Sequence, residues 1–266
     1  MRAAITVKDL VKRFGSHEAV AGITFNVEEG EVFGLLGPNG AGKTTTIRML
    51  TTLLPPTAGE IKIEGLDVSR QGALVRRLIG YVPQALSADG TLTGYENLLF
   101  FAKLLRIPVP EREKRIGEVL ALLGLDEAAA RLVREYSGGM VRRLEIGQAV
   151  LHRPRVLILD EPTVGLDPVA RHTVWHVLEL LRQETGLTVV LTTHYMEEAE
   201  AACQRVAIMH QGRIAAQGTP TELKNRTGKP QATLEDTFTY FTGNQLESGG
   251  SFRETRQMRR RLQRFR

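Results

Sequence analysis

A glycine-rich stretch that follows a short, mostly apolar run constrains this chain most. Residues 37–45 read Gly-Pro-Asn-Gly-Ala-Gly-Lys-Thr-Thr and fit the pattern G-x-x-x-x-G-K-[ST]. The run before it, residues 31–36, is typical of a buried strand, and residues 45–50 are typical of the first turns of a helix. Successive N–H groups in such a loop form an anion nest, and a helix start favours phosphate. The stretch therefore predicts an α/β core built around a phosphate-binding loop.

Residue types within the loop indicate individual roles. Lys43 can place a positive charge on the outer phosphates of a ligand, and the Thr44 hydroxyl can ligate Mg²⁺. A glycine-rich turn that matches by chance is the alternative, but the strand before it and the helix after it argue against that. The residues expected to bind the phosphates are Gly37, Pro38, Asn39, Gly40, Ala41, Gly42, Lys43, Thr44 and Thr45.

Two acidic residues, Asp160 and Glu161, directly follow the apolar run of residues 156–159. Ligands of open parallel sheets bind beyond the carboxyl ends of the strands, so both carboxylates are predicted to face the phosphate loop. We expect Asp160 to hold Mg²⁺ and Glu161 to polarise the attacking water. The alternative is a strand that ends in surface acids without a catalytic role.

Composition and charge exclude several classes of protein. No apolar run approaches the ~18–20 residues needed to cross a bilayer, and the charged N-terminus predicts no signal peptide. A single cysteine, Cys203, suits a reducing compartment. The last sixteen residues carry seven arginines and one glutamate, so the other 250 residues sum to −1 although the whole chain is +5. The folded part is therefore not expected to offer a basic nucleic-acid-binding face.

The pattern along the chain predicts a mixed architecture. Short strands are expected at residues 3–7 and 22–27, and the segment 12–15 between them has an aromatic residue next to a turn glycine, Gly15. Helical spacing over about 87–150 predicts a helical subdomain inserted into the α/β core. We predict one domain over residues 1–228 and a C-terminal extension over 229–266, in which residues from about 228 pack less well.

The order of the motifs resembles the nucleotide-binding domain of ATP-binding cassette (ABC) proteins, over roughly residues 3–225. Residues 136–140, Tyr-Ser-Gly-Gly-Met, resemble the family's signature, and the stretches 37–45 and 156–161 resemble its Walker A and Walker B motifs. Gln84, the segment 165–168, His194 and Phe14 resemble the Q-loop, D-loop, switch histidine and adenine-stacking aromatic. The resemblance implies a P-loop NTPase fold with an antiparallel β subdomain, and ATP and Mg²⁺ as cofactors.

In that family two such domains pair head to tail, with each ATP between one Walker A loop and the opposite signature. The resemblance thus implies that Ser137, Gly138 and Gly139 contact the γ-phosphate held by the partner's Lys43, in a homodimer. It further implies that Gln84 senses Mg²⁺ and water and links them to the helical subdomain. It also implies that His194 holds the γ-phosphate and water in line and that Asp167 reports across the interface. Tyr136, Met140 and Val164-Gly165 depart from the common family pattern, while the Ser-Gly-Gly centre is intact.

Two further segments, residues 192–199 and 233–243, resemble ATPase subunits of type-2 ABC exporters, the group around daunorubicin-resistance and nodulation export. This implies a subunit on the cytoplasmic face of the cell membrane that drives a separate permease exporting a drug, lipid or glycan. Rival hypotheses are a soluble ABC ATPase that acts on nucleic acid or ribosomes, and a non-hydrolysing assembly subunit. No nucleic acid is expected, and Glu161 argues against the non-hydrolysing subunit.

Two further patterns, a pair of histidines and an arginine-rich C-terminal tail, are not explained by the motifs above. His172 and His176 lie four residues apart on an expected helix, but Thr173 stands where a zinc protease needs glutamate, so we expect no metal there. In the tail, Met258, Leu262 and Phe265 recur at i, i+4 and i+7 among arginines. Contact with an anionic membrane and a solvated, disordered tail are both consistent with that pattern.

Overall fold

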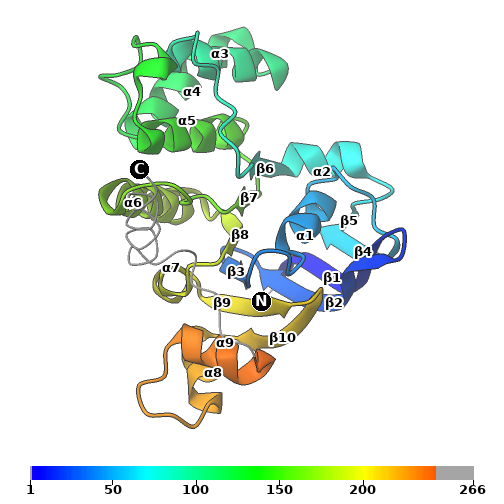
Figure 1. Cartoon of the computed structure of the whole chain (residues 1–266). Coiled ribbons are helices and arrows are strands. Elements are labelled where there is room, and N and C mark those ends of the chain that lie inside the picture. Colours follow the sequence, from blue (N-terminus) through cyan, green and yellow to red (C-terminus); the bar gives the residue numbers. More distant parts are fainter. Residues whose placement is uncertain (1, 244–266) are drawn as a thin grey trace, which may run out of the picture.

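The computed structural model describes residues 2–243, so the tail pattern lies outside the described residues. Two sheets form its centre (Figure 1). The smaller sheet is antiparallel, with the strand order β2-β1-β4-β5. Its strands are β1 (Ala3–Phe14), β2 (His17–Glu28), β4 (Ala58–Ile63) and β5 (Leu66–Asp67). The antiparallel β subdomain implied by the sequence is therefore present.

The larger sheet has the strand order β10-β9-β3-β8-β7-β6, and only β10 runs antiparallel to its neighbour. Its strands are β3 (Val32–Leu36), β6 (Ile79–Val82), β7 (Val156–Asp160), β8 (Thr188–Thr193), β9 (Arg205–His210) and β10 (Arg213–Gly218). Every residue of β3, β7 and β8 is buried, as expected for parallel strands covered on both faces. Their carboxyl ends lie together, because Asp160 pairs with Thr192 and Leu36 with Thr193.

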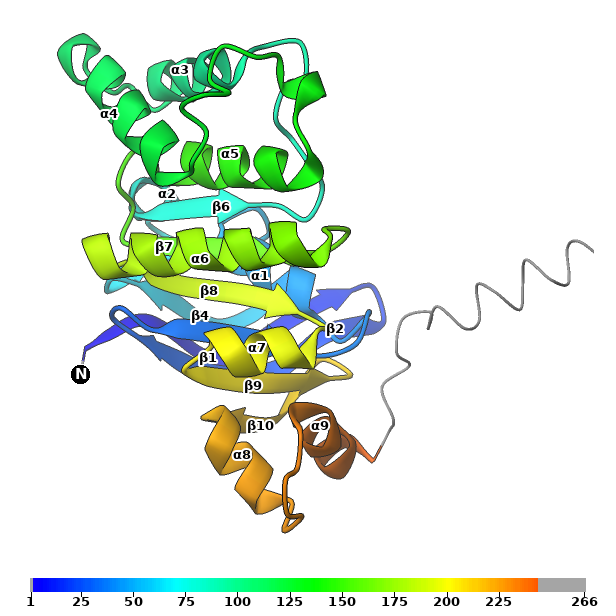
Figure 2. The same ribbon diagram turned by 90° about the vertical axis from the view of Figure 1, so that its left-hand side faces the viewer.

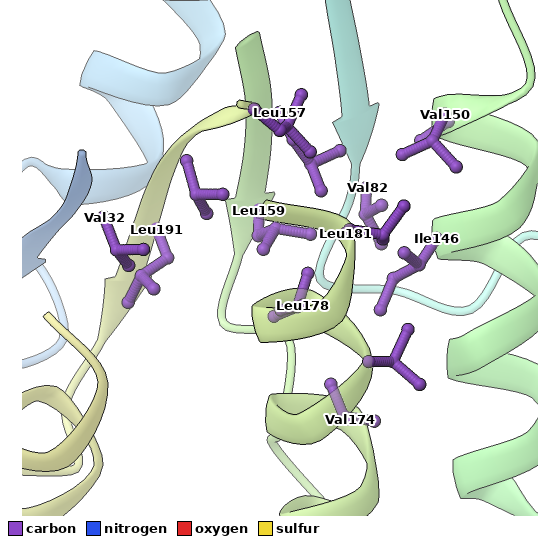
Figure 3. Packing of buried hydrophobic residues seen from close by; sticks show 14 of the residues in the cluster. Val32, Val82, Ile146, Val150, Leu157, Leu159, Val174, Leu178, Leu181 and Leu191 are labelled. Carbon is purple, nitrogen blue, oxygen red and sulfur yellow. The ribbon is translucent and has the colours of Figure 1, made fainter. Parts of the chain in front are cut away.

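Helices cover both faces of this sheet and form a separate layer beside it (Figures 1 and 2). Those of the α/β core are α1 (Lys43–Leu50), α2 (Gly72–Leu78), α6 (Pro168–Thr185) and α7 (Met196–Ala202). The separate layer holds α3 (Gly94–Leu104), α4 (Val109–Leu122), the short η1 (Val133–Glu135) and α5 (Gly138–Val150). Ile146 of α5 and Leu178 of α6 belong to one buried apolar cluster with Leu157 and Leu159 of β7 (Figure 3). This cluster joins the helical layer to the sheet.

The turn expected at Gly15 is present, and the strands on either side of it are longer than expected, since β1 continues to Phe14 and pairs with β2 up to His17. One expectation from the sequence was wrong in detail. Residues 229–243 are better packed than expected, since α9 (Leu234–Thr242) follows α8 (Pro220–Arg226) and buries Phe238 to 1% exposure. Within residues 2–243, no helix combines the length and apolar character that a membrane crossing requires.

Candidate functional site

The phosphate loop joins β3 to α1 and can accept only glycine at two of its positions. Gly37 has φ 156°, and a Cβ there would lie 2.3 Å from the Met209 carbonyl oxygen. Gly42 has φ 103°, and a Cβ there would lie 2.5 Å from the Ala19 carbonyl oxygen. The loop is thus pressed against β9 and β2, which holds its backbone in a shape that L side chains would prevent. Within the loop, Ala41 is buried, while Asn39 and Gly40 are exposed.

Lys43 is the first residue of α1 and is 5% exposed. Its ammonium donates to the carbonyl oxygens of Gly37 at 2.8 Å and Pro38 at 3.2 Å, and lies 3.4 Å from Glu161 Oε1. Burial lowers the pKa of Lys43, and the Glu161 and Asp160 carboxylates offset part of that shift. The loop therefore directs its own lysine toward the acidic end of β7.

Glu161 is the point where side chains from four segments of the chain meet. Besides Lys43, Gln84 Nε2 donates to Glu161 Oε2 at 3.3 Å, and His194 Nδ1 lies 3.3 Å from the same oxygen. Burial raises the pKa of Glu161, but hydrogen bonding from His194 and the Lys43 charge outweigh burial, so the pKa is lowered overall. Glu161 also has φ 48°, a left-handed conformation that costs a non-glycine residue about 1–2 kcal/mol. Such a backbone outlier at a buried carboxylate is typical of functional sites.

Asp160 lies beside Glu161 and is held by two hydroxyls. Thr192 Oγ1 donates to Asp160 Oδ1 at 2.6 Å, and Thr44 Oγ1 donates to the same oxygen at 3.3 Å. Thr192 also accepts from the Glu161 N–H at 2.9 Å. Hydroxyl and carboxylate oxygens are the ligands that Mg²⁺ prefers, so the pair Thr44 and Asp160 fits that ion. Within residues 2–243, no group of three or more His, Cys, Asp or Glu residues is arranged for a metal.

Three groups of expected site residues lie apart from this cluster. Ser137, Gly138 and Gly139 lie at the start of α5, where Ser137 caps the helix by accepting from Met140 N at 3.3 Å. Ser137 and Gly138 are exposed, whereas Gly139 is buried against Ala170 of α6. Among the described residues, no hydrogen bond or ion pair joins that helix start to the phosphate loop, and Figure 1 shows α5 in the separate helical layer. Asp167 caps α6 by accepting from Val169 N and Ala170 N at 3.0 Å. Within residues 2–243, no hydrogen bond or ion pair joins Asp167 to the phosphate loop either.

Phe14 lies at the end of β1 and is 49% exposed, with Lys12 Nζ 5.2 Å from its ring centroid. A turn after Phe14 connects β1 to β2. The Ala19 carbonyl oxygen, near the start of β2, lies against Gly42 of the phosphate loop. His172 and His176 are exposed on α6, away from the cluster around Glu161.

Reasoning from the sequence missed two residues that hold the site together. Thr192 orients both acids, yet it reads in the chain as an ordinary strand threonine. Arg142 donates from α5 to the carbonyl oxygen of Gln84 at 2.7 Å. The parallel register of β7 and β8 would have indicated Thr192, but that register is not visible in the sequence.

Comparison with known proteins identifies the family to which this fold belongs. The sequence profile of the ABC transporter family matches residues 20–164. The daunorubicin/doxorubicin resistance ATP-binding protein of Streptomyces peucetius is 44% identical over 85% of this chain and 68% of its own length. The Nod factor export ATP-binding protein I of Paraburkholderia xenovorans (strain LB400) is 43% identical over 83% of this chain and 72% of its own length.

A solved structure described as the ATP-binding subunit of an ABC transporter superposes with a TM-score of 0.79 at 30% identity. It covers 90% of this chain and 99% of its own. The resemblance and the fold class inferred from the motifs are therefore confirmed.

Proposed function

The chain belongs to the ABC transporter family as an ATP-binding, ATP-hydrolysing subunit, and from this premise we propose that it powers an exporter through a separate membrane permease. The observation that carries the proposal is the convergence of Lys43, Gln84 and His194 on Glu161. Relatives named for daunorubicin/doxorubicin resistance and for Nod factor export support export of a drug, lipid or glycan. The subunit would then work on the cytoplasmic face of the cell membrane.

ATP would be gripped by residues 37–45, with Lys43 on the outer phosphates and Phe14 stacked on the adenine. Thr44 and Asp160 would hold Mg²⁺, with Gln84 nearby, and bound Mg²⁺ neutralises charge that develops on the transferred phosphoryl group. The lowered pKa of Glu161 keeps its carboxylate ionised near neutral pH, as a general base requires. His194, beside the same carboxylate, would hold the γ-phosphate in line with the water.

A second copy of the chain would complete each site. Ser137, Gly138 and Gly139 begin a helix whose first N–H groups are suited to an anion, and Ser137 and Gly138 are exposed. Because nothing in the described residues ties them to the phosphate loop of their own chain, they are free to face the γ-phosphate on a partner. Asp167 would lie close to that interface through its position at the start of α6. Head-to-tail pairing of identical copies gives two equal sites.

Substitution of the base tests this assignment. Glu161→Gln should still bind ATP, should hydrolyse it on the order of a hundredfold more slowly, and should accumulate an ATP-bound dimer. Glu184→Gln, an exposed acid at the end of α6, is the matched control and should leave turnover and dimerisation unchanged. ATP turnover, nucleotide affinity and size-exclusion chromatography provide the readouts. Near-normal turnover of Glu161→Gln would show that another residue is the base.

Co-purification from detergent-solubilised membranes tests the transport partner. The proposal expects a polytopic membrane protein to remain bound to the tagged chain. The alternative, action on nucleic acid or ribosomes, expects bound RNA or DNA instead. The charge of −1 on residues 1–250 favours the first result, because nucleic-acid binding usually requires a basic face.

A further inference from the structure

An ion pair between Arg142 and Glu145 lies fully inside the protein, one turn apart on α5. Each side chain is 2% exposed, and Arg142 NH1 lies 3.0 Å from Glu145 Oε2. Neither residue contacts Lys43, Asp160 or Glu161 in the described structure. The pair therefore needs an explanation beyond the cluster around Glu161.

The partners of the pair all lie in one loop, residues 83–88, which leaves β6. Arg142 donates to the carbonyl oxygens of Pro83 and Gln84, both at 2.7 Å. Glu145 Oε1 accepts from the Ser87 N–H, from the Ser87 hydroxyl at 3.1 Å and from Ala88 N at 3.3 Å. The loop is thus bound to α5 at both of its ends.

Stability alone is a weak reason to bury this pair. Desolvation of two charges commonly cancels their attraction, and apolar residues of similar volume are often as stable or more so. The guanidinium group differs from such residues in geometry, because its rigid fork orients two carbonyl oxygens at once. The arrangement points to positioning of the loop rather than to packing.

We propose that Arg142 and Glu145 form a clamp that positions Gln84 and joins it rigidly to the Ser137 end of α5. Gln84 is held by its backbone at Arg142 and reaches Glu161 with its side chain. Ser137 caps the same helix only five residues before Arg142. A displacement of Gln84 at one nucleotide therefore moves the helix start that faces the partner's nucleotide. This inference rests on the proposed function, since it assigns Gln84 and Ser137 to two ATP sites.

A double-mutant cycle with Gln84 tests the clamp. The apolar pair Arg142→Met with Glu145→Met should keep the fold and lower kcat between about tenfold and a hundredfold, because a mispositioned group costs that much. KM for ATP should change less than about twofold, since Lys43 and the rest of the phosphate loop, residues 37–45, are untouched. In the Gln84→Ala background the same pair should lower kcat no further, because its effect acts through Gln84.

Arg143→Met is the matched control on the same helix. Arg143 also donates to backbone carbonyls, those of Leu123 and Gly124, but not to the loop 83–88. Any loss of kcat in this variant should be the same with and without Gln84→Ala. Arg142→Lys serves as a second variant if the apolar pair does not fold. It keeps the charge beside Glu145 but lacks the fork, so kcat should fall while KM holds.

Amide hydrogen exchange gives a readout that does not depend on hydrolysis. Residues 83–88 should exchange faster in the apolar pair, while β7 and α1 keep their rates. The clamp would be overturned if the apolar pair lowered kcat equally in the parent and in the Gln84→Ala background. Unchanged amide exchange of residues 83–88 in the apolar pair would overturn it as well. Normal turnover in Gln84→Ala would instead overturn the role proposed for Gln84, and the exchange result alone would then decide whether the clamp exists.

Discussion

Replacing Thr192 with valine would separate the orientation of the two acids from the packing around them. Thr192 is fully buried, and its hydroxyl donates to Asp160 at 2.6 Å and accepts from the Glu161 N–H at 2.9 Å. Valine keeps the shape of threonine and removes both contacts. Serine does the opposite, because it keeps the hydroxyl and removes one methyl group.

The expected magnitudes follow from what remains after each change. The Glu161 N–H keeps a backbone partner, the Thr192 carbonyl oxygen at 3.2 Å. Losing its hydrogen bond to the Thr192 hydroxyl should therefore cost little stability. From the side chains of residues 2–243, the Asp160 carboxylate then keeps only the longer hydrogen bond from Thr44. A hydrogen bond to a charged group contributes about 1.5–3 kcal/mol. Thr192→Val should therefore lower Tm by roughly 3–12 °C, at 2–4 °C per kcal/mol. Thr192→Ser loses about 1 kcal/mol of packing, or roughly 2–4 °C.

The assay is ATP turnover as a function of Mg²⁺ concentration, alongside thermal unfolding. Thr192→Val should need more Mg²⁺ for half-maximal turnover, because the Asp160 carboxylate is no longer oriented. Thr192→Ser should show the Mg²⁺ dependence of the unchanged chain despite its lower Tm. Equal shifts of the Mg²⁺ dependence in both variants would refute the reasoning, since the methyl group and not the hydroxyl would then matter.

Two further predictions concern pH and the C-terminal helix. Glu161 has a pKa below its ordinary value of 4.5, so its ionised form contributes stability that is present above that value and is lost as pH falls through the lowered pKa. The Tm difference between the unchanged chain and Glu161→Gln should thus be largest above about pH 5 and should shrink in acid; a constant difference across that range would contradict this. Phe238→Ala should destabilise the fold by about 3–5 kcal/mol, because the ring is 1% exposed between α9 and β9; a denaturation midpoint within error of the parent would show that α9 does not dock.

The phosphate loop was predictable because its signals are local. The strand, the glycines and the helix start follow one another within about twenty residues, and each signal depends on backbone geometry that the residue types impose. Gly37 and Gly42 illustrate this, since any side chain at either position would collide with a carbonyl oxygen. The Ser-Gly-Gly helix start was predictable for the same reason, because Ser137 caps the helix that begins directly after it.

Contacts between distant segments were not predictable in this way. Thr192 orients the acids only because β8 lies beside β7 with Thr192 opposite Asp160. Arg142 and Glu145 carry no signal of burial in the sequence, and they are buried because the loop 83–88 folds over α5. The packing of α9 was underestimated because its burial depends on α8, α7 and β10, which composition near residue 228 does not reveal.

The sequence by itself determined the family and the fold, and it predicted which loop binds a nucleotide phosphate, because those features are written in consecutive residues. Tertiary structure decided which side chains reach the Glu161 carboxylate and how Gln84 is held. Lys43, Gln84 and His194 are brought to it from segments that lie up to 151 residues apart in the chain, and only the order and register of the strands determine that they meet.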